Sequence, residues 1–183
     1  MSDTSSTSDL SARVKTGFPL AAGIAILLFT PALVIGLAVL AVAFIGAQEL
    51  TAMLSAKSDN SDTIVILPEW LLPGTAVLMG LGALSGESGL HGALLICVLG
   101  WIFFELVFTP KSELAKLSTL GFGLFGMVWA VWSVLHITLI KILPEGTALL
   151  FFLLLVISFS DNFAYFGGKC FGKSLLAPSI SPK

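Results

Sequence analysis

Charged side chains are scarce in this chain of 183 residues, of which only 11% are Asp, Glu, Lys or Arg while 56% are hydrophobic. A soluble domain typically carries about 25% charged residues, because its surface has to face water. The scarcity excludes an ordinary soluble domain and predicts an integral membrane protein. The formal net charge of −2 is small, which argues against nucleic acid as a partner.

Side chains that bind metals or form disulfides are also few, since the chain has two cysteines and two histidines. Cys97 and Cys170 lie far apart and form no C-x-x-C pair, so they predict neither a zinc site nor a disulfide framework. His91 and His136 do not stand at the spacing of metal ligands, and we interpret them as loop or helix-packing residues.

Long apolar runs separated by short polar loops predict an all-α fold, a polytopic membrane bundle of about six transmembrane helices. Proline interrupts helices, so the pair Thr30–Pro31 divides the first apolar run in two. The first helix is short, and a hairpin arm that does not fully cross is the alternative for it. The run has no small-residue cleavage site, which argues against a signal peptide. The expected spans are 17–30, 32–50, 69–85, 90–108, 117–140 and 146–160.

The distribution of basic residues predicts the orientation of these spans. With the N-terminus inside, six spans place eight of the nine Lys and Arg residues on the inner side and leave only Lys141 outside. We therefore expect a plasma (inner) membrane protein with a cytoplasmic N-terminus. Its expected parts are a disordered tail over 1–12, a transmembrane domain over 13–160 and a cytoplasmic-face segment over 161–183.

The stretch "GGKCFGKS" over 167–174 matches the phosphate-binding pattern G-x-x-x-x-G-K-[ST]. A P-loop needs a strand before it and a helix after it, inside an α/β domain. Pro178 and Pro182 leave no room for that helix, and the membrane spans leave no place for a sheet. What survives is glycine backbone that can approach a ligand, beside two lysines.

Asp161 is the most informative single residue, because it follows a stretch of twelve residues that is almost entirely apolar. The six-span scheme puts it at the cytoplasmic end of the last helix, where the helix dipole disfavours an aspartate. A Mg²⁺ ion that also holds nucleotide phosphates would offset this cost, and solvation by interfacial water is the alternative. Tyr165, the only tyrosine, is either an interface aromatic or a ligand contact.

Several other residues are candidates for a structural or a functional role. Glu49 and Glu105 end the second and fourth spans, as interfacial caps or as parts of a polar cavity. Gly82 and Gly86 predict close helix packing in the third span. The lysines near the end of the chain are either ordinary inside charges or phosphate ligands.

The last 24 residues, "SDNFAYFGGKCFGKSLLAPSISPK", resemble a signature of the phosphatidate cytidylyltransferases, the CDP-diacylglycerol synthases. Upstream the resemblance is looser: a basic N-terminus, a helix pair that ends in "QEL" and a glycine-rich fifth span. The positions that match the signature in register are Asp161, Ala164, Tyr165, Gly168, Lys169, Gly172, Lys173, Leu176, Pro178, Ser181 and Pro182.

The resemblance implies that CTP and phosphatidate are converted to CDP-diacylglycerol and pyrophosphate, with Mg²⁺ as cofactor and membrane lipid as partner. A homodimer is compatible with this reading. By resemblance Asp161 is also the metal ligand. The implied catalytic residues are Asp161, Lys173, Ser181 and Lys183, and the implied substrate-binding residues are Tyr165, Gly168, Lys169, Gly172 and Pro182.

The sequence departs from the family pattern in one respect. The family continues beyond this signature to a second one, which supplies further acidic metal ligands. We therefore expect a fragment that is inactive alone; a second chain that completes the site, or an inactive product, are the alternatives. Two other functions stay open at this point: a related CTP-dependent membrane lipid kinase, and a non-enzymatic membrane protein.

Overall fold

The computed structural model describes residues 19, 22–56, 68–108 and 113–172, and this part of the chain forms helices without any strand. This confirms the predicted all-α membrane bundle. Within the described ranges, four helices are long and apolar enough to cross a membrane, over Ala32–Leu54, Glu87–Phe108, Lys116–Ile142 and Gly146–Gly168. A short helix over residues 22–28 comes first. It is followed by α2 (Ala32–Ala56), α3 (Leu71–Leu84), α4 (Glu87–Phe108), α5 (Glu113–Gly126), the π-helical η2 (Met127–Trp132), α6 (Ser133–Ile142) and α7 (Gly146–Phe171).

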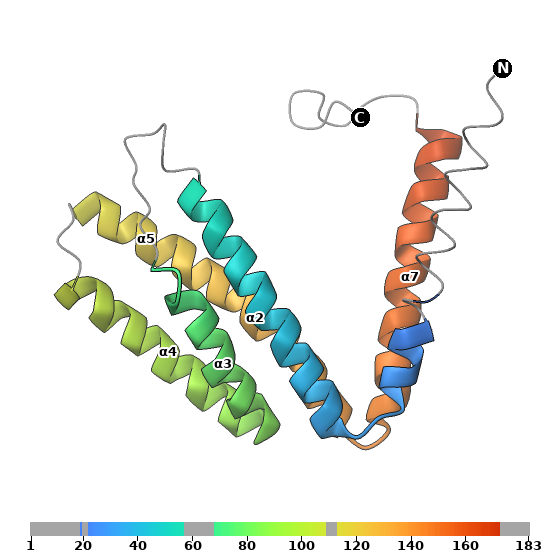
Figure 1. Ribbon diagram of the computed structural model, residues 1–183. Coiled ribbons are helices and arrows are strands. Elements are labelled where there is room, and N and C mark those ends of the chain that lie inside the picture. The colour runs from blue at the N-terminus through green and yellow to red at the C-terminus, as the bar shows by residue number, and fades with distance from the viewer. Residues whose placement is uncertain (1–18, 20–21, 57–67, 109–112, 173–183) are drawn as a thin grey trace.

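The helices form a bundle from which the last one departs. Figure 1 shows α2, α3, α4 and the continuous α5–η2–α6 helix side by side, while α7 leans away from them toward its C-terminal end. Successive helices alternate in direction, so α2, α4 and α7 all end at the same end of the molecule. We call this the Asp161 end and the opposite one the Lys141 end.

Small residues let the helices of the bundle approach closely. Gly82 of α3 faces Gly89 of α4, and a Cβ on either would overlap the carbonyl oxygen of the other. The predicted close packing at Gly82 is therefore confirmed, but its partner is Gly89. Gly86 instead lies in the α3–α4 turn with φ of +100°, a conformation that glycine adopts without strain.

The long helix after α4 contains a six-residue π-helical segment, η2, which the sequence pattern did not predict. The Ser133 side chain donates a hydrogen bond to the Val128 carbonyl five residues earlier, at 2.8 Å. This bond matches the wider π-helical turn. Such segments are rare and often accompany functional sites.

The Lys141 end is tied together by one lysine. The Lys141 Nζ donates hydrogen bonds to the Leu28 carbonyl and to the Thr147 hydroxyl, each at 2.6 Å. These bonds join the short helix over 22–28 to the α6–α7 turn. In that turn Glu145 has φ of 61°, a left-handed conformation that allows the sharp reversal of direction.

Two helices extend beyond the predicted spans. The helix expected to end at residue 50 continues to Ala56, and the one expected to end at residue 160 continues to Phe171. The polar run near Asp161 does not end α7, because a helix can satisfy such side chains locally. The Asn162 amide, for example, donates to the Ser158 carbonyl at 2.7 Å.

Candidate functional site

Asp161 lies within α7 and not at its end. The side chain is exposed, and the residue falls inside the candidate span Gly146–Gly168. It is roughly 22 Å along the helix from its start, whereas the hydrocarbon layer is about 30 Å thick. The expectation that a helix C-terminus surrounds Asp161 is therefore wrong. Asp161 needs a polar partner more than it would at the end of a helix, because an ionised group inside a membrane span is costly.

Asp161, Tyr165 and Gly168 share one face of α7, since residues four and three apart lie above one another on a helix. Toward the Lys141 end the same stripe contains Leu150 and Leu154. Leu150 is buried, and Leu154 packs against the core of the bundle. The face that carries the carboxylate is thus continuous with the face by which α7 contacts the bundle.

The glycines of the signature lie at the end of α7. A Cβ on Gly168 would meet no heavy atom within 4 Å, so the backbone there is open to an approaching group. The Gly172 amide donates to the Gly168 carbonyl at 2.9 Å and closes the helix. Lys169 lies on the same turn. Lys173, Ser181, Pro182 and Lys183 lie outside the described residues.

The described residues do not form a complete metal site by themselves. Among them, no three His, Cys, Asp or Glu side chains come together in a way that could hold a metal ion. Mg²⁺ is commonly held by one or two protein carboxylates together with substrate phosphates and waters. Asp161 fits the role of one such carboxylate, and the donor set is incomplete within residues 19–172 as described.

Glu105 and Glu49 both lie toward the Asp161 end, and they differ in environment. Glu105 of α4 is fully buried, so it is not an interfacial cap. Glu49 of α2 is exposed and lines a pocket of about 350 Å³ with Gly46 and Trp129. Glu49 and Glu105 therefore do not line one common polar cavity.

A small polar pocket at the same end was missed from sequence. It has a volume of about 270 Å³ and is lined by Gln48, Thr51, Ala52 and Glu69. The Thr51 hydroxyl donates to the Ala47 carbonyl at 2.8 Å, which leaves Gln48 and Glu69 as its main polar groups. The only sequence signal was that these residues follow or precede apolar runs.

The two histidines come together at the Lys141 end, far along the bundle from Asp161. Their ring centroids are 6.3 Å apart, and Trp132 packs edge-on against His136 with centroids 4.3 Å apart. His136 Nδ1 donates to the Trp132 carbonyl at 2.8 Å. The pair lines a pocket of about 330 Å³ that also includes Glu87. His136 thus has the helix-packing role that was predicted.

Comparison with known proteins identifies the family. The model of the cytidylyltransferase family matches residues 11–183. The chain is 30% identical over 164 residues to a phosphatidate cytidylyltransferase of Chlamydia trachomatis, and 28% identical over 165 residues to one of Chlamydia muridarum. Each alignment covers 82% of this chain and 52% of the relative, so the chain spans about half the length of the curated relatives it matches. No solved structure matches it significantly. The chain belongs to the cytidylyltransferase family.

Proposed function

We propose that this chain contributes to a phosphatidate cytidylyltransferase, which forms CDP-diacylglycerol and pyrophosphate from CTP and phosphatidate. The observation that carries the proposal is the face of α7 with Asp161, Tyr165 and Gly168, inside a membrane-spanning helix of a cytidylyltransferase-family chain. Relatives that match most of this chain are named for the same activity.

The place of the reaction follows from the two substrates. CTP is a water-soluble anion, and the phosphate of phosphatidate stays at the surface of the bilayer that holds its acyl chains. They meet only near the boundary, so α7 has to bring its polar face to a region that water reaches. We assign the Asp161 end to the cytoplasmic side of the plasma (inner) membrane, on the positive-inside bias of the sequence.

The chemistry is a displacement at phosphorus. A phosphate oxygen of phosphatidate attacks the α-phosphorus of CTP, a new P–O bond forms, and the bond to the pyrophosphate oxygen breaks. The protein contributes positioning and stabilisation of the developing negative charge. Lys169, Lys173 and Lys183 are proposed to face the phosphates, while Gly168 and Gly172 allow the backbone to approach them.

We also propose Mg²⁺ as the cofactor, with Asp161 as one of its ligands. When bound, the ion would neutralise phosphate charge between the two substrates. Tyr165, one turn after Asp161, is proposed to contact substrate. Ser181 and Pro182 are proposed to shape the segment that leads to Lys183. Further ligands are proposed to come from outside the described residues.

The test uses membranes that contain the complete encoded protein, because a fragment is expected to be inactive alone, and supplies them with CTP and phosphatidate. Wild type is expected to form CDP-diacylglycerol. Asp161→Asn keeps the size of the side chain and removes its charge, and we expect a loss of roughly 10²–10³-fold. Asn162→Ala is the matched control, since Asn162 bonds only within α7 in the described structure. Full activity in Asp161→Asn would overturn the proposal.

A further inference from the structure

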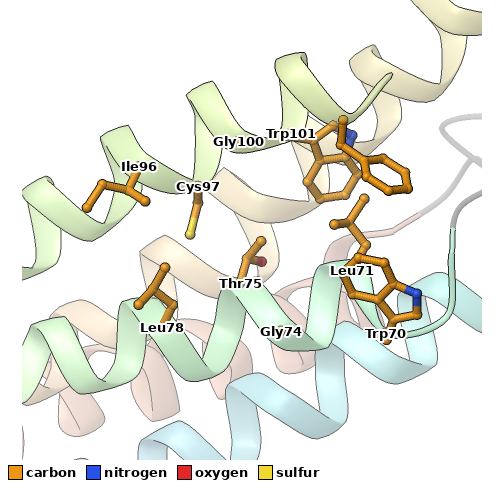
Figure 2. Close-up of a pocket in the computed structure, with 10 residues that line it drawn as sticks. Trp70, Leu71, Gly74, Thr75, Leu78, Ile96, Cys97, Gly100 and Trp101 are labelled. Carbon is orange, nitrogen blue, oxygen red and sulfur yellow. The ribbon is translucent and has the colours of Figure 1, made fainter. Parts of the chain in front are cut away.

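We propose that a groove between α3 and α4 holds one acyl chain of a phospholipid from the leaflet at the Asp161 end. The groove has a volume of about 420 Å³. Figure 2 shows residues of both helices lining it. Its lining includes Trp70, which directly precedes α3, Gly74, Thr75 and Leu78 of α3, and Cys97 and Gly100 of α4.

The floor of the groove suits an apolar ligand. Thr75 and Cys97 are 7% and 6% exposed, and Figure 2 shows both side chains between the two helices. The Thr75 hydroxyl donates to the Leu72 carbonyl at 2.7 Å and so is already satisfied. Gly74 and Gly100 leave the groove open, because a Cβ on either would meet no heavy atom within 4 Å.

The dimensions select a hydrocarbon chain over a helix. The lining extends over nine residues on each side, from Trp70 to Leu78 and from Ile96 to Phe104, and eight helical rises make this length roughly 12 Å. A volume of about 420 Å³ over roughly 12 Å leaves a cross-section of about 35 Å². A helix about 10 Å wide needs roughly 80 Å². A hydrocarbon chain can therefore lie in the groove along its whole length, whereas a helix could place only a ridge of its side chains there.

The bilayer is the source of the chain, because the groove is continuous with the membrane-facing surface. Leu78 and Ile96 lie at the end of the groove farther from the Asp161 end, and they are 43% and 61% exposed. Trp70 lies at the nearer end, is 63% exposed and packs edge-on against Phe104, with ring centroids 5.7 Å apart. Tryptophan favours the headgroup level. We therefore place the headgroup near Trp70 and the chain along the groove toward Leu78.

Retention of this lipid depends on van der Waals contact, because lipid tails are as apolar as the groove itself. The walls are held in place by the Gly82–Gly89 contact of α3 and α4. In Figure 1 the α3–α4 pair lies across the bundle from α7. The bound phospholipid is thus a resident lipid and not the one presented to Asp161, and the inference does not rest on the proposed function.

The experiment fills the groove and counts the lipid. Gly100→Leu places a side chain in the groove, and Gly92→Leu, at an equally open glycine of α4 outside the groove lining, is the matched control. Each protein is purified from membranes in a mild detergent and examined by native mass spectrometry. Wild type and Gly92→Leu are expected to retain one phospholipid, and Gly100→Leu to lose it.

A second readout measures contact inside the groove. Trp101 is 1% exposed and lines the groove, so a variant with Trp101 as the only tryptophan reports on a chain seated there. In bilayers of phospholipid brominated on its acyl chains, its fluorescence is expected to be quenched. Adding Gly100→Leu should abolish that quenching, whereas adding Gly92→Leu should not.

Two results would overturn the inference: equal lipid retention in all variants, or neither retention nor quenching in the parent proteins. If Gly100→Leu does not fold, Gly74→Leu fills the same groove from α3 and gives the same test. Asp161→Asn should keep the lipid even if it loses enzymatic activity, which separates this inference from the proposed function.

Discussion

Gly123 of α5 lies directly against the indole ring of Trp101 of α4. A Cβ at position 123 would overlap the ring atoms Cζ2 and Cε2. Gly121, two residues earlier, has no heavy atom within 4 Å of its would-be Cβ. At the level of single residues, then, one glycine sets the distance between two helices and its neighbour does not.

The substitution Gly123→Ala is expected to destabilise the protein by about 1–3 kcal/mol, because the ring of Trp101 or the helix backbone has to shift. Gly121→Ala is the control and should be neutral or slightly stabilising, since alanine favours helix over glycine. The measurement is thermal unfolding in detergent. Equal melting temperatures for the two variants would contradict the described packing.

Lys141 makes a second residue-level contribution, at the opposite end of the bundle. Lys141→Met removes the donor to both Leu28 and Thr147 and is expected to cost about 1–3 kcal/mol. Thr147→Val removes only one of the two bonds and should cost less. Unfolding in denaturant gives both values, and a larger effect for Thr147→Val would contradict this role.

At the level of elements, the sequence predicted α4 more accurately than α7. Apolar length alone locates a span, which is why the expected helix over 90–108 agrees with Glu87–Phe108. The end of α7 was mispredicted because Asp161 was read as a stop signal. A helix tolerates one exposed carboxylate, and no proline follows before Pro178 to end it.

The continuation of α7 can be tested by cysteine scanning from position 158 to 172 in a chain without native cysteines. If α7 is helical there and its polar face meets water, a charged thiol reagent should label positions 161, 165, 168 and 172 fastest. A loop after Asp161 would instead be labelled without a period of three to four residues. That result would contradict the helix.

At the level of the whole molecule, the sequence predicted an all-α membrane bundle because composition and apolar length are local properties. Features that depend on how helices pack were not visible. The burial of Glu105, the pairing of His91 with His136 and the groove beside Thr75 each need partners from distant helices. By contrast, the extent of α7 alone is enough to predict that Asp161, Tyr165 and Gly168 share one face.

Orientation is a prediction for the molecule as a whole. In intact cells, Cys170 at the Asp161 end should resist a membrane-impermeant thiol reagent, whereas Glu145→Cys at the Lys141 end should react. Both positions are exposed, so accessibility depends on the side of the membrane. The reverse pattern would place the Asp161 end outside, away from CTP.

The proposed reaction transfers a cytidylyl group to a membrane lipid. The most direct measurement supplies phosphatidate-containing membranes of the encoded protein with CTP labelled at either the α- or the γ-phosphate. We expect the α-label to enter the lipid and the γ-label to leave as pyrophosphate. Entry of the γ-label into lipid would indicate a kinase and contradict the proposed transfer. The absence of any CTP-dependent label in lipid would contradict it as well.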